Sequence, residues 1–98
     1  MSRRISFHEV AELEIIDAAS RFEADQPELS AALIDEVERA IQQILIYPHS
    51  CQLVNRTVRR KVLRRFPYDL MYSVKPDVIR ILALASQRRQ PFYWRGRV

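Results

Sequence analysis

The chain has 98 residues, with 16 Lys and Arg against 12 Asp and Glu and a single cysteine. This length predicts one domain, residues 1–98, around one core. One cysteine excludes an intrachain disulfide and a cysteine-based zinc site, as expected in a reducing cytoplasm. No segment has the roughly 20 apolar residues of a membrane-spanning helix, and no apolar N-terminal run is typical of a signal peptide. We therefore expect a cytoplasmic protein without membrane contact.

The charge is divided unevenly along the chain. Residues 1–50 hold four Lys or Arg and ten Asp or Glu, which gives a net charge of −6. Residues 51–98 hold twelve Lys or Arg and two Asp or Glu, which gives a net charge of +10. A half this basic favours a partner that carries phosphates or an acidic protein. The alternative is a solvated basic surface that the acidic half balances.

A short strand over residues 2–7 is predicted to lead into the first of two helices. Ser6 and Glu9 have the spacing of a capping box, so a helix should begin directly after Ser6. Apolar residues at helical spacing continue to a break at Pro27, and a second amphipathic helix follows to Tyr47. The two segments predict an antiparallel helical hairpin.

Neither helix shows a catalytic or metal-binding pattern. His8 and His49 are the two histidines, and neither has a second ligand at metal spacing. The acids of the first helix are scattered in phase, which is typical of a solvated face. We expect no metal and no cofactor.

Three strands are predicted in the second half. Residues 57–66 carry five Arg and Lys within seven positions, and their apolar residues keep no single parity, which indicates a bulge or partial cover on both faces. Residues 68–74 alternate with one face on a core, and residues 78–85 are apolar on both parities except at Arg80, as in an inner strand.

The order of these elements predicts an α+β fold, β-α-α-β-β-β, with a helical hairpin packed on a small twisted antiparallel sheet. The predicted core consists of Ile15, Phe22, Val37, Ile41, Leu70, Tyr72, Ile81 and Ala83.

Three motifs carry the most specific signal, namely Arg65-Phe66-Pro67-Tyr68, Tyr72-Ser73-Val74 and the basic, aromatic run from Gln87 to Trp94. With the order of elements, they resemble the RelE/ParE superfamily of toxins from bacterial type II toxin–antitoxin systems, of the ParE-like, plasmid-stabilisation type. The resemblance covers nearly the whole chain. It implies the same α+β fold, a cognate antitoxin that neutralises the toxin in a hetero-oligomer, and a ligand face on the basic side of the sheet and the tail.

The superfamily has two activities on one fold, so the fold does not decide the function. RelE-like members cut messenger RNA on the ribosome, whereas ParE-like members poison DNA gyrase. If the chain is a nuclease, arginines would stabilise the phosphate, and Lys61 or Tyr93 would transfer protons. By motif position Arg60, Arg64 and Arg88 match basic positions of the nuclease branch, and Tyr93 or Trp94 matches its C-terminal aromatic residue. With Lys61 as a proton-transfer group, the candidate catalytic residues are Arg60, Lys61, Arg64, Arg88 and Tyr93.

Two departures from the nuclease pattern favour the gyrase-directed branch. Asp69 stands where nuclease members carry an arginine, and Ser86 stands where many relatives carry a histidine. We therefore expect a ParE-like toxin. Its target-binding candidates are Arg88, Arg89, Tyr93, Trp94 and Arg95. Three alternatives stay open: a ribosome-dependent endoribonuclease, a non-toxic module that still binds its antitoxin, and an aromatic tail that folds back to cap the core instead of contacting a ligand.

Overall fold

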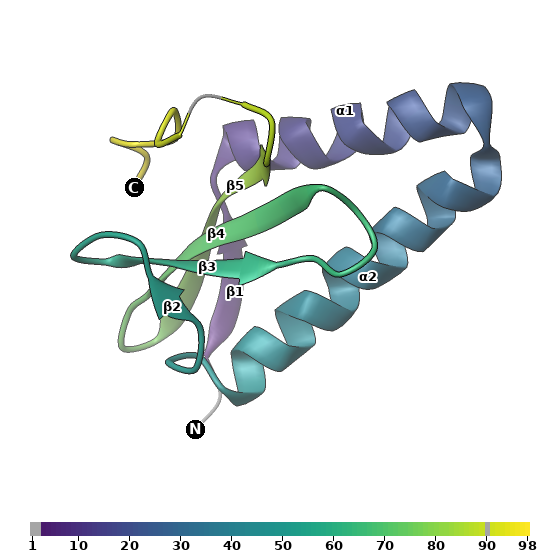
Figure 1. The fold of residues 1–98 in the computed structure, drawn as a ribbon. Coiled ribbons are helices and arrows are strands. Elements are labelled where there is room, and N and C mark those ends of the chain that lie inside the picture. The colour runs from purple at the N-terminus through teal and green to yellow at the C-terminus, as the bar shows by residue number, and fades with distance from the viewer. Residues whose placement is uncertain (1–2, 90) are drawn as a thin grey trace.

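The structure is a computed structural model that describes residues 3–89 and 91–98. Within these residues two helices lie against a five-stranded sheet (Figure 1). The elements are β1 (Arg4–Phe7), α1 (Glu9–Asp25), α2 (Pro27–Ile46), β2 (Gln52–Leu53), β3 (Val58–Val62), β4 (Tyr68–Val74) and β5 (Val78–Ser86).

The strand order in the sheet is β1-β5-β4-β3-β2. Strands β2 to β5 form an antiparallel meander, and β1 pairs with β5 in parallel. The α+β class and the order of its main elements are confirmed. The sheet is mixed, however, because the connection from β1 to β5 contains the helical hairpin and three strands, which is long enough for parallel pairing.

The predicted capping box is wrong. Residue Ser6 belongs to β1, and its hydroxyl accepts a hydrogen bond from Arg80 of β5 at 2.6 Å. The helix α1 starts at Glu9, and its N-cap is His8, whose Nδ1 accepts from the Val10 N–H at 3.1 Å. Pairing with β5 therefore keeps Ser6 in the sheet and moves the helix start towards the C-terminus.

The first core lies between the helices and one face of the sheet, which we call the helix face. It buries five of the predicted core residues, Val37, Ile41, Leu70, Tyr72 and Ile81. Ile15 and Phe22 are half-buried against it, and the Phe22 ring meets Phe66 edge to face at 5.3 Å between centroids. The amphipathic stripes of the two helices therefore make the contacts that their periodicity predicts.

The basic strand is shorter than predicted. Strand β3 ends at Val62 and pairs with β4 in continuous register. Leu63 and Phe66 lie in the loop that follows, where both turn into the helix-face core. The irregular parity of residues 57–66 thus arises because the strand ends, and not from a bulge within it.

A bulge does occur in β5. Ile81 and Ala83 pair with Tyr72 and Met71, which are consecutive in β4, so Leu82 is an extra residue without a partner there. The extra residue reverses the alternation of the side chains. Ile79, Ile81 and Leu84 face the helices, whereas Leu82, Ala83 and Ala85 face the other side.

The opposite face of the sheet, which we call the tail face, has a small core of its own. Its buried residues are Val58, Met71, Leu82, Ala83, Ala85 and Trp94. Trp94 comes from the C-terminal tail, by which we mean the described residues after β5, and is only 4% exposed. The tail thus folds back over the sheet (Figure 1). Ala83, predicted in one core with Ile81, is buried in this second core.

Candidate functional site

The five candidate catalytic residues are divided among three cavities, and Tyr93 lines both the one that holds Arg60 and the one that holds Arg88. Arg60 of β3 lines a cavity on the tail face together with Arg89. Lys61 is the next residue along β3 and therefore points to the other face. With Arg64, it lines a separate cleft of about 380 Å³ against α2. Arg88 lines a third cleft, between the tail and α1.

The cavity on the tail face, here called the tail cavity, has a volume of about 380 Å³ and lies between β3, β4, β5 and the tail. Asp69 lines it, and its carboxylate accepts from the Gln87 side chain at 3.0 Å. The Ser86 hydroxyl accepts from the Arg88 N–H at 3.3 Å. Both residues that depart from the nuclease pattern therefore hold the start of the tail.

The tail presents arginines beside aromatic rings. The Arg89 guanidinium lies 4.0 Å from the centre of the Tyr93 ring, and the Arg95 guanidinium lies 5.0 Å from that of Phe92. Such stacking restricts a long side chain while leaving its charge available. Arg88, Arg89 and Arg95 are all exposed. The tail surface is therefore positively charged and partly preorganised.

The hydroxyl of Tyr93 is hydrogen-bonded to a carboxylate of α1. It donates to Glu14 Oε2 at 2.8 Å. Burial, and then the bond to Glu14, raise the pKa of Tyr93 above its ordinary value. A proton-transfer group works best with a pKa near the operating pH, so this environment disfavours Tyr93 in that role.

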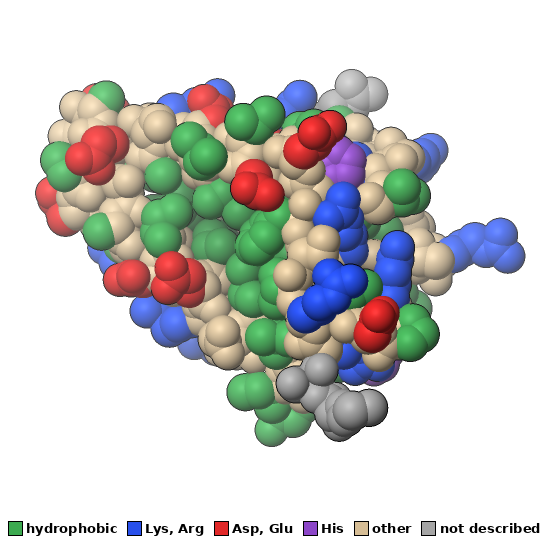
Figure 2. Space-filling model, turned by 180° about the vertical axis from the view of Figure 1, so that it is seen from behind, with side chains coloured by type: hydrophobic (Ala, Val, Ile, Leu, Met, Phe, Trp, Pro, Cys, Tyr) green, Lys and Arg blue, Asp and Glu red, His purple; other side chains and the backbone are tan. Residues whose placement is uncertain are grey.

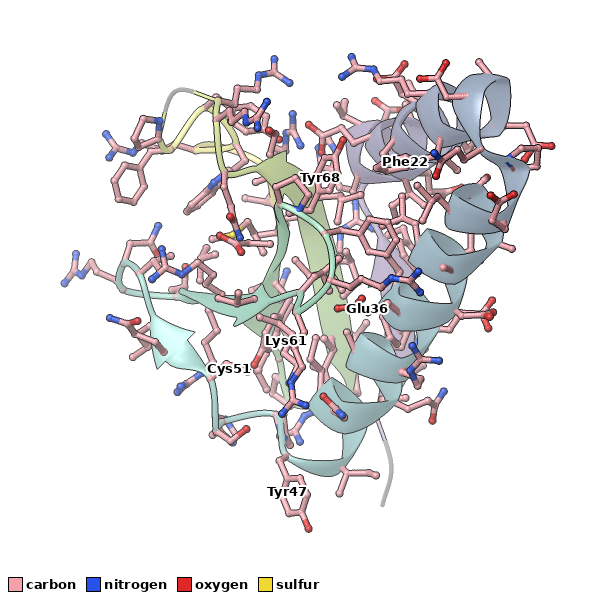
Figure 3. All side chains as sticks on the ribbon, turned by 45° about the vertical axis from the view of Figure 1, so that its right-hand side comes forward. Phe22, Glu36, Tyr47, Cys51, Lys61 and Tyr68 are labelled. Carbon is pink, nitrogen blue, oxygen red and sulfur yellow. The ribbon has the colours of Figure 1, made fainter. Side chains whose placement is uncertain are left out.

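The carboxylate of Glu36 on α2 holds the loop after β3. It accepts from the backbone N–H groups of Arg64 and Arg65. Figure 3 shows Glu36 reaching from α2 towards this loop, with Lys61 on the neighbouring strand. The basic part of the loop is thereby tied to α2, while Pro67 at its other end accepts from the N–H of the first tail residue, Gln87, at 3.0 Å.

A fourth recess lies beside the outer strand β1. It has a volume of about 740 Å³, an apolar floor of Ile5, Phe7 and Ile41, and the acidic side chains of Asp35 and Glu38 on α2. We call it the β1 groove. Figure 2 shows the hydrophobic surface in the middle of this face, with acidic side chains towards the helices and basic ones on the other side.

Comparison with known proteins decides the family. The family described as "ParE toxin of type II toxin-antitoxin system, parDE" matches residues 5–91. The chain belongs to this ParE toxin family. No curated protein matches it. Among solved structures, this ParE-family chain is similar to one described as "Chromosomal ParDE TA system from P. aeruginosa", with a TM-score of 0.75 and 15% identity, over 86% of this chain and 95% of that chain. The chain is therefore a toxin of the type II toxin–antitoxin class, as the resemblance implied.

One residue of this ParE toxin that matters for its tail was missed from the sequence. Glu14 was grouped with the solvated acids of the first helix, yet its side chain is only 13% exposed. Ala11 and Ala18 stand three residues before it and four residues after it, and both are buried. A carboxylate in phase with small apolar residues was the signal, because a buried acid needs a partner.

Trp94, one of the expected target-binding residues of the ParE toxin, is a core residue of the tail face. Its ring packs in the cluster with Met71 and Ala85, so the exposed charges of the tail are those of Arg88, Arg89 and Arg95, beside the exposed apolar side chains of Phe92 and Val98.

The described residues contain neither a cluster of metal ligands nor a membrane-spanning helix. No three His, Cys, Asp or Glu side chains among residues 3–89 and 91–98 gather as a metal site requires. In the same part of the ParE-family chain, neither helix has the length and apolar content needed to cross a membrane.

Proposed function

We propose that this ParE-family toxin inhibits bacterial growth by binding DNA gyrase through the arginines of its tail, and that a cognate antitoxin neutralises it in a hetero-oligomer. The observation that carries the proposal is the separation of the nuclease candidates, with Arg60 on the tail face and Lys61 and Arg64 on the helix side.

Cleavage of RNA requires a base, an acid and cations around one phosphate. In this chain Arg60 and Arg89 share the tail cavity with Asp69, whose negative charge opposes a phosphate there. The two proton-transfer candidates are also unfavourably placed, because Tyr93 donates to Glu14 and Lys61 faces α2. This arrangement supports a binding function over a catalytic one.

The tail suits a protein target with an acidic surface. Arg88, Arg89 and Arg95 are exposed on a segment anchored by Trp94, so their charges are presented from a fixed base. Charge complementarity of this kind speeds association and selects the partner.

The β1 groove suits the antitoxin. Its floor of Ile5, Phe7 and Ile41 would take apolar side chains. The two acids of α2 in its lining outnumber the one cation, Arg39, and so favour basic residues in the same segment. The basic half of the chain favours an acidic stretch elsewhere in the antitoxin. We infer a segment that is disordered when free and orders on binding.

The test is induction of the toxin in a bacterial host, with messenger RNA mapped by primer extension, and in parallel a supercoiling assay with purified gyrase. Inhibition of gyrase without RNA cleavage is expected. Arg88→Ala should weaken the inhibition about tenfold, equivalent to about 1.4 kcal/mol of lost binding. Lys75→Ala is the matched control, since it removes one exposed positive charge from the turn before β5, at the far end of that strand.

Codon-phased RNA cuts would instead favour the ribosome-dependent nuclease, for which the pairing of Arg60 and Arg89 in the tail cavity is the favourable observation. Unchanged growth, gyrase activity and RNA would leave a non-toxic antitoxin-binding module. The antitoxin proposal is tested by co-expression with the neighbouring reading frame and size exclusion. Absence of a complex at micromolar concentrations would refute that part.

A further inference from the structure

Strand β5 extends beyond its parallel neighbour. The ladder between β1 and β5 ends at the pair Phe7 and Ile81, where the His8 N–H donates to the Ile81 carbonyl at 2.8 Å. β5 continues to Ser86, so on this side its last residues have no neighbouring strand among the residues that the structure describes. Backbone groups in such a position need other partners.

Side chains of α1 and of the tail supply these partners. The Leu84 N–H donates to Glu14 Oε1 at 3.1 Å. The Leu82 carbonyl accepts from Arg97 Nη1 at 3.0 Å, and the Leu84 carbonyl accepts from the Tyr93 hydroxyl at 3.4 Å. Glu14, Tyr93 and Arg97 thus take the place of a strand along this part of β5.

The carboxylate of Glu14 joins the three groups. Arg97 donates to both of its oxygens, at 2.9 and 3.3 Å, and Tyr93 donates to Oε2 at 2.8 Å. Arg97 and Glu14 are both largely buried, with side chains 15% and 13% exposed. Hydrogen bonds between charged groups that are shielded from water are stronger than neutral ones. One residue of α1 therefore fixes two residues of the tail.

The same contacts orient an exposed arginine. The Arg89 guanidinium stacks 4.0 Å from the centre of the Tyr93 ring and lies 3.9 Å from Glu14, while its side chain remains 59% exposed. Its direction therefore depends on a tyrosine that Glu14 holds in place.

We propose that Glu14 is a positioning residue, which locks the tail onto β5 and so sets the direction in which the tail arginines meet the target. The inference rests on the proposed target-binding role of the tail. Glu14 acts through Tyr93 and Arg89 rather than by touching the target. Trp94 supplies the burial that keeps the tail on the sheet, and Glu14 sets where along β5 the tail is held.

Trp94 is the single tryptophan of the chain, so its fluorescence reports on the tail alone. In Glu14→Ala we expect a red-shifted emission and several-fold stronger quenching by acrylamide, with the far-UV circular dichroism of the two helices unchanged. Glu14→Gln, which keeps hydrogen-bonding atoms and loses the charge, should give an intermediate result. Glu12→Ala is the matched control, because Glu12 is an exposed acid in the first turn of the same helix.

The second readout is inhibition of gyrase supercoiling. Glu14→Ala should weaken it about tenfold, Glu14→Gln less, and Glu12→Ala should leave it unchanged. If Glu14→Ala does not fold, the double variant with Tyr93→Phe and Arg97→Gln disrupts the contacts of the tail with Glu14 and leaves the bond between Glu14 and the Leu84 N–H. The fluorescence of that protein then decides the test.

Unchanged quenching of Trp94 in a folded variant would overturn the proposal, and so would full inhibition of gyrase by a protein whose tail is released. If the unmodified toxin does not inhibit gyrase, the proposed function fails by itself. The quenching result then still decides whether Glu14 positions the tail.

Discussion

Truncation of Ile81 to Ala should destabilise the fold about twice as much as truncation of Ile41 to Ala. Ile81 is 0% exposed in β5, an inner strand between β1 and β4, whereas Ile41 is 8% exposed and forms part of the floor of the β1 groove. Each change removes the same three carbon atoms. The difference therefore comes from the surroundings of the two side chains.

The lost transfer free energy is about 0.8 kcal/mol per carbon, or about 2.4 kcal/mol for either change. At Ile81 the neighbouring strands are fixed by their hydrogen bonds, so a cavity remains and raises the cost to about 4 kcal/mol. At Ile41 the space opens into the groove, where water and neighbouring side chains can fill it, and the cost stays near 2 kcal/mol.

Urea unfolding monitored by circular dichroism gives the free energy of unfolding of the unmodified protein and of each variant. The two losses can be compared if the dependence of this free energy on urea concentration is the same in all three proteins. A loss of about 4 kcal/mol is a large part of the 5–15 kcal/mol that a domain of this kind has. An equal cost at both positions, or a larger one at Ile41, would refute the assignment of an open groove beside β1.

Two further predictions concern the hydrogen bonds of Tyr72 and Glu36. Burial, and then the neighbouring Cys51, raise the pKa of Tyr72, so the folded chain keeps this proton more tightly than the unfolded one. The stability gained from this pKa difference is complete below about pH 10 and declines above it. In Tyr72→Phe this decline should be smaller. The variant should also lose about 1–2 kcal/mol of stability at neutral pH, because the Pro48 carbonyl loses its donor. Thermal unfolding between pH 7 and 11 measures the decline in stability, and an identical decline in the variant would contradict the prediction. Glu36→Gln weakens the bonds that the Arg64 and Arg65 N–H groups donate, so hydrogen exchange of these two amides, followed by NMR, should become about tenfold faster. The amides of β4 should be unchanged and serve as the internal control.

The helical hairpin was predictable because its signal is long and local. In α2 every buried residue, from Leu33 to Ile44, falls on one stripe of a 20-residue segment. The proline at its start fixes where it begins, since Pro27 takes the first helical position. Such patterns depend only on nearby residues, so tertiary contacts had little to change.

The start of α1 and the faces of β5 were not predictable for the opposite reason. Ser6 has a good capping sequence, but its partner in the fold is Arg80, far away in the chain. In β5 both parities are apolar, so nothing in the sequence marks Leu82 as the extra residue. The side on which Ala83 lies follows from that bulge alone.

The positive charge of the candidate site was predictable from the sequence, but the contacts that hold its arginines in place were not. The exposed arginines of the tail were found as a basic run after a buried strand. Their support was not found, because Glu14 lies on α1 and contacts Arg97, 83 positions later. The phase of Glu14 with Ala11 and Ala18 indicates its burial, but a partner at such a separation leaves no local pattern.

The position of β5 has a consequence for how the toxin is made. It is the last strand in the chain and the one that joins β1 to the meander, and Ser6 and Arg80 are 74 positions apart. During synthesis the helical hairpin therefore emerges with its apolar side uncovered, and the sheet cannot close until nearly the whole chain has been translated. A ribosome that stops before residue 86 releases a fragment without a completed sheet and without the edge that holds the tail. The sheet on which the proposed target-binding tail rests is thus complete only after β5 has been translated.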